Sequence, residues 1–129
     1  MPRTVASPAT STRQTGQAAE VLAADFLQRQ GLTVRARNFR VRGGEIDLIC
    51  EEGQTLVFVE VRLRQRQDFG GAAASITPRK QQRIILAARH YLARQRLESH
   101  DCRFDCLLLE RLDSAGMVWL KGAFDAGGN

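Results

Sequence analysis

The chain has 129 residues, of which 43% are hydrophobic, and its formal net charge is +5. This length predicts a single domain whose core needs no disulfide or structural metal. The apolar runs are far shorter than the roughly 18 residues of a membrane span, so no membrane association is expected, and the arginine-rich charge favours phosphate-rich partners.

The N-terminal part of the sequence predicts a tail followed by a helix. Residues 1–13 lack acids and, apart from Val5, large apolar side chains, so we expect a disordered tail without a secretory signal. Residues 17–30 carry apolar side chains at helical spacing, and Gly31 ends this helix. Glu20 lies one step off the apolar stripe and is either a solvated acid favoured by the helix dipole or a functional acid at the edge of the core.

Three strands joined by short turns are predicted next. Residues 32–41 form a weakly alternating strand rich in arginine, and residues 45–50 and 55–63 form two very apolar strands. Apolar strands of this kind are usually buried on both faces, yet these two carry Asp47 and Glu60. An antiparallel meander would place the two carboxylates opposite each other.

The second half of the sequence predicts a loop, a helix and two further strands. The Gly-rich segment 64–75 has the composition of a mobile binding loop. Thr77 and Pro78 begin a helix that runs to about Arg96, with an apolar stripe toward the core. A second stripe is basic and is expected to face away from the core; it holds Lys80, Arg83, Ala87, His90 and Arg94.

The complete order predicts one α/β domain at residues 14–124, with a flexible tail at 125–129. A strand at 107–109, introduced by Arg103 and its neighbours, and a strand at 117–120 complete a mixed sheet flanked by helices. The three cysteines are odd in number and lack a zinc-binding spacing, so we expect reduced core residues in a cytoplasmic protein. They are Cys50, Cys102 and Cys106.

The basic residues cluster in a way that favours a nucleic-acid-binding face over a merely solvated surface. Five arginines lie between Arg29 and Arg42, and nine basic residues lie between Arg62 and Arg96 with Asp68 as the only acid. The guanidinium fork binds phosphate oxygens bidentately. The candidate contacts are Arg40, Arg42, Arg64, Arg66, Lys80 and Arg83.

The paired acids predict a magnesium site. A buried carboxylate is costly unless a cation or donor meets it, and Mg²⁺ is normally held by one or two carboxylates together with water and phosphate. Asp47 is preferred to Glu45, which shares its strand face but lies beside a turn where water reaches it. Arg62 lies on the Glu60 face and could hold a phosphate, but a group that stays protonated cannot act as a general base. A buried salt bridge with Arg62 and no chemistry is the structural alternative.

The acids and their neighbours resemble the PD-(D/E)xK nuclease superfamily, which includes restriction endonucleases and archaeal Holliday-junction resolvases. The predicted order of helices and strands is also similar to the restriction-endonuclease-like core of that superfamily. A closer similarity, over residues 16–121, is to the YraN-type family of small, bacterial, endonuclease-like proteins. The matching positions are Gly16, Ala19, Glu20, Asn38, residues 44–49, residues 57–62, Phe69, Gly70, Lys80 and residues 103–105.

This resemblance implies that Glu20, Asp47 and Glu60 are acidic site residues and that Arg62 is the fourth catalytic position. Asp47 and Glu60, with the Val61 carbonyl, would bind Mg²⁺ or Mn²⁺. Arg62 stands where the superfamily typically has lysine. Either Arg62 acts electrostatically, or Lys80 takes over the role of the lysine, or hydrolysis is lost.

Three functions therefore compete. The first is a metal-dependent endonuclease that hydrolyses phosphodiester bonds in DNA, with branched or damaged DNA as candidate substrates; a resolvase-like enzyme needs two sites and hence a homodimer. The second is a nucleic-acid-binding module with a catalytically silent site. The third is an interaction protein with no nucleic-acid role.

Overall fold

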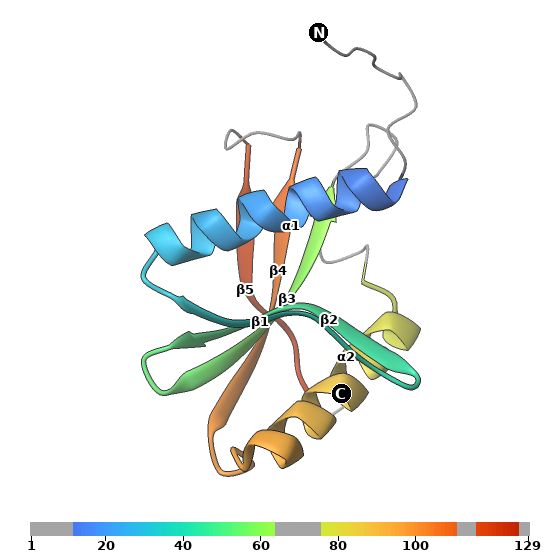
Figure 1. The fold of residues 1–129 in the computed structure, drawn as a ribbon, viewed down its shortest axis with the longest axis vertical. Helices are drawn as coiled ribbons and strands as arrows, with labels where there is room; N and C mark the ends of the chain where they lie inside the picture. Colours follow the sequence, from blue (N-terminus) through green and yellow to red (C-terminus); the bar gives the residue numbers. More distant parts are fainter. Residues whose placement is uncertain (1–11, 64–75, 111–115, 127–129) are drawn as a thin grey trace, which may run out of the picture.

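Two helices pack on opposite faces of a five-stranded sheet (Figure 1). The computed structural model of the chain describes residues 12–63, 76–110 and 116–126, and for residues 12–15 it describes the backbone alone. The elements are α1 (Thr12–Arg29), β1 (Thr33–Val41), β2 (Gly44–Glu52), β3 (Thr55–Leu63), α2 (Pro78–Gln95), β4 (Asp101–Leu109) and β5 (Val118–Phe124).

The end of α1 and the start of α2 lie where the sequence signals predicted, whereas α1 begins five residues before the predicted residue 17. Gly31 has a left-handed φ of 98° and the amide of Leu32 donates to the carbonyl of Leu27, which closes the end of α1. Thr77 caps α2 by accepting a hydrogen bond from the Lys80 amide at 3.1 Å, and Pro78 is the first helical residue. At the other end, α1 begins at Thr12, so two residues of the predicted tail are helical.

The sheet is mixed, as predicted, and its strand order follows the sequence. β1, β2 and β3 form an antiparallel meander, β3 and β4 are parallel, and β4 and β5 are antiparallel. The connection from β3 to β4 contains α2, because parallel neighbours require a crossover. β4 and β5 are longer than expected; β4 begins at Asp101 and β5 extends to Phe124. The predicted binding loop 64–75 lies outside the described residues, as do residues 1–11 and 127–129 of the predicted tails.

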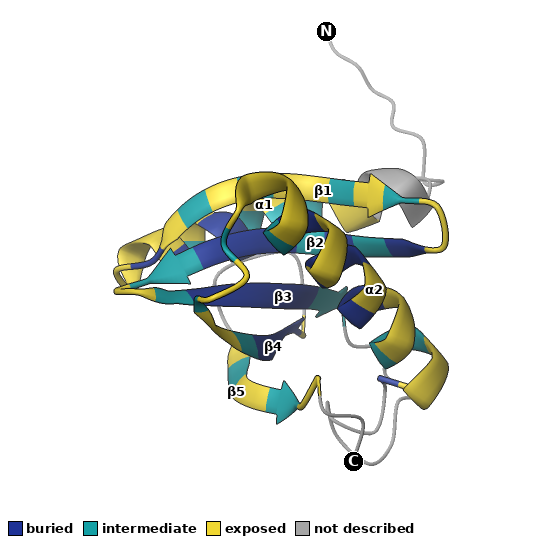
Figure 2. Ribbon diagram, turned by 90° about the horizontal axis from the view of Figure 1, so that it is seen from below, coloured by how far each residue is buried: buried dark blue, intermediate teal, exposed yellow. Residues whose placement is uncertain are grey.

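The core has two main parts because the central strands are buried on both faces (Figure 2). In β3, Val57 and Val59 pack toward α1, whereas Leu56 and Phe58 pack toward α2. This alternation places Glu60, the next residue on the Leu56 and Phe58 face, on the α2 side of the sheet. No helix among the described residues is long and apolar enough to cross a membrane.

The basic stripe of α2 faces away from the core only in part. Arg83, His90 and Arg94 are exposed, but Ala87 is fully buried. The reason is Gly44: a Cβ built there would lie 2.4 Å from the carbonyl oxygen of Arg83 and 3.1 Å from the amide nitrogen of Ala87. The absence of a side chain at Gly44 lets α2 pack directly on β2, which buries the middle of the stripe.

Two of the three cysteines are core residues, as predicted. Cys50 and Cys106 are free and buried, and burial is the main cause that raises the pKa of each thiol to about 12. Cys102 is free but exposed, so the prediction was wrong for this residue. Cys102 lies at the start of β4, before the strand enters the core, and its thiol donates to the carbonyl of His100.

Candidate functional site

The candidate site lies where β2 separates from β3. Backbone pairing between the two strands ends at Leu48 and Val59. In the same register, the next pair would be Asp47 with Glu60. Instead, the Asp47 carboxylate accepts a hydrogen bond from the Val61 amide through Oδ2, at 2.8 Å. The Asp47 side chain thus accepts a hydrogen bond where backbone pairing between β2 and β3 has ended. This hydrogen bond holds Asp47 against the Glu60–Val61 segment.

Both β1 and β2 are irregular beside Asp47, β1 at Asn38 and β2 between Ile46 and Leu48. Asn38, which lies between the paired residues Arg37 and Phe39, has a left-handed φ of 52°. Asparagine tolerates this conformation better than most residues. Across the same point in β2, Ile46 packs with the α2 side of the core and Leu48 with the α1 side, although they are two residues apart. Strict alternation between the two sides of the core is therefore lost between Ile46 and Leu48.

Glu20 joins the site from α1. Burial, followed by the charge of Asp47, raises the pKa of the Glu20 carboxyl to about 6, and a hydrogen bond with the Asn38 side chain acts in the opposite direction. A side-chain interaction with Asp47 raises the pKa of Glu20 further. The helical acid predicted at the edge of the core is therefore part of this cluster and is not a solvated residue at the helix start.

Glu60 meets Lys80 from α2 on the other side of the sheet. Its side chain is only 4% exposed, and its Oε2 lies 2.9 Å from Lys80 Nζ. Burial and the charge of Asp47 nevertheless raise the pKa of Glu60 to about 7, against the lowering effect of Lys80. One ammonium group therefore does not offset the negative charge that Asp47 and Glu60 bring together.

The residues fit a hard divalent cation in chemistry. Glu20, Asp47 and Glu60 supply carboxylate oxygens, the donor type that Mg²⁺ and Mn²⁺ prefer. The pKa values of Glu20 and Glu60 are raised to about 6 and about 7, so a bound cation would favour the deprotonated, metal-ligating form of both acids. Within residues 12–63, 76–110 and 116–126, no three His, Cys, Asp or Glu side chains form a ready-made metal cage.

The remaining predicted site residues lie around these acids. Arg62 is half-buried and lies near Cys106, whose pKa is raised by burial and Glu60 and lowered by Arg62. Arg40 is 3.7 Å from Glu45 and opposes the raised pKa of Glu20. Arg42, like Arg83, is exposed. Arg64 and Arg66 lie outside the described residues.

The structural alternative to a metal site paired the strand acids with Arg62, whereas the structure pairs Glu60 with Lys80. The sequence placed Lys80 on an outward stripe, but Lys80 lies in the first turn of α2, directly over the end of β3. The Thr77 cap and Pro78 set where this turn begins, and they were the signal that could have placed Lys80.

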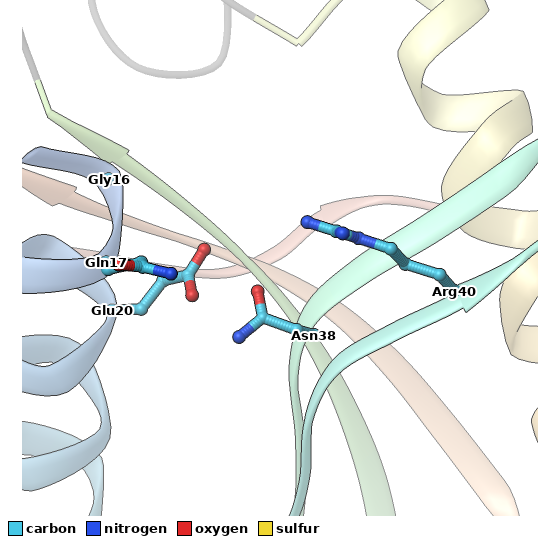
Figure 3. Close-up of a pocket in the computed structure, with 5 residues that line it drawn as sticks. All are labelled: Gly16, Gln17, Glu20, Asn38 and Arg40. Carbon is cyan, nitrogen blue, oxygen red and sulfur yellow. The ribbon is translucent and has the colours of Figure 1, made fainter. Parts of the chain in front are cut away.

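A pocket of about 320 Å³ opens beside Glu20, between α1 and β1. Figure 3 shows the side chains of Gln17 and Glu20 from the helix and those of Asn38 and Arg40 from the strand around a common space. Gly16 completes the lining. Sequence reasoning assigned no role to Gln17 or Asn38, because neither side chain is charged and neither breaks a hydrophobic pattern.

A second buried acid, Asp105, has a structural role. It is fully buried, and its two oxygens accept from Arg103 Nε and Nη2, Trp119 Nε1 and the Gly122 amide, all at 2.9–3.0 Å. Arg103 also donates to Glu52 at 2.7 Å. Asp105 therefore fixes the irregular pairing of β4 with β5, and all its hydrogen bonds come from the protein itself.

Comparisons with known proteins agree on one family. The model of the family described as "Uncharacterised protein family UPF0102" matches residues 19–109. A UPF0102 protein of Dechloromonas aromatica (strain RCB) is 56% identical over 116 residues, which cover 90% of this chain and 92% of that protein.

Two further relatives cover the chain to a similar extent. A UPF0102 protein of Methylobacillus flagellatus (strain ATCC 51484 / DSM 6875 / VKM B-1610 / KT) is 53% identical over 114 residues, with 88% and 99% of the two chains covered. One of Pseudomonas putida (strain GB-1) is 48% identical over 121 residues, with 92% and 98% covered. The matched segment includes Glu20, Asp47, Glu60 and Lys80. The chain belongs to the UPF0102 family.

Proposed function

We propose that this protein is a metal-dependent nuclease that hydrolyses phosphodiester bonds in DNA. The observation that carries the proposal is the meeting of Asp47 and Glu60 where β2 and β3 stop pairing. The pKa of Glu60 stays near 7 although Lys80 lies 2.9 Å away. A site of this kind has carboxylate oxygens in place and gains stability when a divalent cation arrives.

Each acid has a distinct part in the proposal. Asp47 and Glu60 would hold the ion, and the Asp47 hydrogen bond to the Val61 amide fixes the orientation of one ligand before binding. The Val61 carbonyl is a further candidate ligand. Glu20 would hold a water or complete the ion's outer shell. When bound, Mg²⁺ or Mn²⁺ would activate a water and neutralise charge on the phosphate.

Lys80 is the best candidate for the positive group beside the reacting phosphate. It reaches Glu60 from the first turn of α2, and it therefore supplies an ammonium group at the place where Arg62 departs from the superfamily pattern. Arg62 lies on the same side of β3 and would bind the phosphate through its planar fork. The geometry favours Lys80 over Arg62 for the lysine role, because Lys80 contacts a metal-site acid directly.

The basic residues around the site give DNA an approach. Arg40 and Arg42 lie on β1 before the hairpin turn, and Arg83 lies where α2 packs against Gly44 just after that turn. Lys80 lies against Glu60, and the charge of Arg40 acts on Glu20, so these four basic residues would contact phosphates of DNA bound at the acids. Contacts to phosphate position DNA without reading its sequence.

A nucleic-acid-binding protein with a silent site is the second candidate. It is favoured by the internal partners of the acids, since Glu60 is paired with Lys80 and Asp47 with the Val61 amide. It predicts salt-sensitive binding that survives in Asp47→Ala and weakens when Lys80 and Arg83 are reversed to glutamate.

The test is cleavage of linear, flapped and four-way DNA by the purified protein, with Mn²⁺, with Mg²⁺ and with chelator. The nuclease proposal predicts metal-dependent cleavage that Asp47→Ala abolishes. Glu45→Ala is the matched control, because Glu45 lies on the same strand but faces Arg40 and water. Binding of DNA by the wild-type protein without cleavage in either metal selects the second candidate.

A further inference from the structure

The pocket beside Glu20 has a feature that packing does not explain. Gly16 lies inside α1, where glycine costs helix stability relative to alanine. A Cβ built on Gly16 meets no described atom within 4 Å, and its φ is not left-handed. Neither a close contact nor a backbone conformation requires glycine here. What the missing side chain does provide is open space in the pocket.

The chemistry of the lining selects a class of ligand. Gln17 and Asn38 offer amide groups that both donate and accept, and Glu20 accepts, whereas Arg40 at the rim donates (Figure 3). The carboxylate of Glu20 disfavours an anion in the interior of the pocket. The polar lining disfavours an apolar group. A flat, uncharged group with several donors and acceptors fits, and amide side chains pair with the edges of nucleobases in this way.

The position of the pocket relates it to the acids. Glu20 belongs both to the pocket lining and to the cluster with Asp47. A strand whose phosphate reached Asp47 and Glu60 would therefore pass the mouth of the pocket, where Arg40 can contact a neighbouring phosphate. With a volume of about 320 Å³, the pocket has no room for a stacked base pair and admits a single base that has left the stack.

We infer that the pocket formed by Gly16, Gln17, Glu20, Asn38 and Arg40 binds one unpaired nucleobase of the strand presented to the acids. This inference rests on the proposed function and adds a substrate class to it: DNA with an unpaired nucleotide next to the bond to be cut. Gly16 keeps the pocket open, the amides and Glu20 hold the edge of the base, and Arg40 holds the adjoining phosphate.

The experiment measures binding in the presence of chelator, so that no DNA is cut. Three labelled duplexes are compared: one with a single unpaired nucleotide, one with an abasic nucleotide at the same place, and one fully paired. Gly16→Leu fills the pocket, and Gly16→Ala is its control, since alanine and leucine have similar helix propensities and neither meets a described atom at Cβ. The wild-type protein should prefer the unpaired base over both other duplexes by about tenfold.

Gly16→Leu should lose that preference while binding the fully paired duplex as the wild type does, and Gly16→Ala should keep most of it. A preference that persists in Gly16→Leu, or equal binding of the abasic duplex by the wild type, overturns the inference. Metal-dependent cleavage of fully paired DNA, unchanged in Gly16→Leu, overturns it and leaves the nuclease proposal intact. Absence of DNA binding by the wild type in chelator also overturns the inference, and the cleavage assay with Mn²⁺ and Mg²⁺ then decides the nuclease proposal separately.

Discussion

Lys80 Nζ lies 2.9 Å from Glu60 Oε2, although the two residues belong to α2 and β3 and are separated by a Gly-rich segment. The pair connects the first turn of the helix with the point where β2 leaves β3. It also brings an ammonium group to Glu60 that β3 itself lacks, because this strand carries Arg62 and no lysine. Lys80 therefore distinguishes the two candidate functions. In the nuclease it acts beside the reacting phosphate, whereas in the binding protein it only contacts DNA.

Replacing Lys80 should separate catalysis from binding. Lys80→Met is expected to lower the cleavage rate by about a hundredfold or more, the usual cost of losing one preorganised charged group at a reacting phosphate. Arg83→Met, one turn further along the exposed part of α2, should weaken DNA binding modestly and leave the cleavage rate of bound DNA unchanged. Single-turnover cleavage at saturating protein measures both. A Lys80→Met protein that cleaves at the wild-type rate would return the lysine role to Arg62.

The raised pKa of Glu60 predicts a stability cost at neutral and basic pH. Its folded-state pKa of about 7 lies above its ordinary value of 4.5, so between these values the folded state binds more protons than the unfolded state. The free energy of unfolding therefore falls as the pH rises from 4.5 through 7, and the full cost remains at pH 8. Glu60→Gln removes this cost.

Glu60→Gln should accordingly be more stable than the wild type at pH 8, by about 1–3 kcal/mol, with little difference at pH 4.5. Urea unfolding at the two pH values measures the change. Glu45→Gln is the control, because Glu45 is partly exposed beside Arg40, and it should show no such pH dependence. A Glu60→Gln protein that is less stable than the wild type at pH 8 would mean that the Lys80 pair outweighs burial.

Gly44 is expected to be intolerant of a side chain. A Cβ there would meet the Arg83 carbonyl at 2.4 Å, so Gly44→Ala should force α2 away from β2 and destabilise the fold by about 1–3 kcal/mol. Gly16→Ala should do the opposite and stabilise it by about 0.5–1 kcal/mol, because that position is helical and open. Thermal unfolding of both variants is the measurement. A melting temperature of Gly44→Ala equal to that of the wild type would show that α2 adjusts to the added methyl group without cost.

Asp105 should act on stability and not on chemistry. Asp105→Asn breaks the two-bond pair with Arg103 and leaves that guanidinium without its buried partner, for which we expect a loss of about 3–5 kcal/mol. Trp119 is the only tryptophan of the chain, and its indole donates to Asp105, so its fluorescence reports the change. Asp25→Asn, at an exposed helix pair, should cost far less. If Asp105→Asn were as stable as the wild type but no longer cleaved DNA, Asp105 would belong to the candidate site and not to the structural network.

The element order was accessible from the sequence because its signals are local. The Thr77 cap, the glycine after α1 and the apolar runs of β2 and β3 each act within a few residues. Asp47 and Glu60 could be paired in advance because both interrupt apolar strands. The ends of β4 and β5 were missed because the buried network of Asp105, Arg103 and Trp119 extends them through contacts distant in sequence.

The direction in which the Asp47 side chain points could not be derived from the alternation of apolar and polar residues along β2. Its carboxylate accepts a hydrogen bond from the Val61 amide of the neighbouring strand, and Asn38 with its left-handed φ lies across from it in β1. Ala87 was likewise placed on the outer stripe because helical periodicity takes no account of a glycine on the facing strand. In both cases the deciding group lies in another element.

Binding of Mn²⁺ is the sharpest test of a metal site formed by Asp47 and Glu60, because it requires neither the right DNA nor a complete catalytic cycle. Titration of the metal-free protein at pH 8, followed by the electron paramagnetic resonance of free Mn²⁺, should show saturable binding by the wild type and by Glu45→Gln. Asp47→Asn and Glu60→Gln should each lose it. Equal Mn²⁺ binding by the wild type and all three variants, or no binding by the wild type, would contradict a metal site where β2 separates from β3.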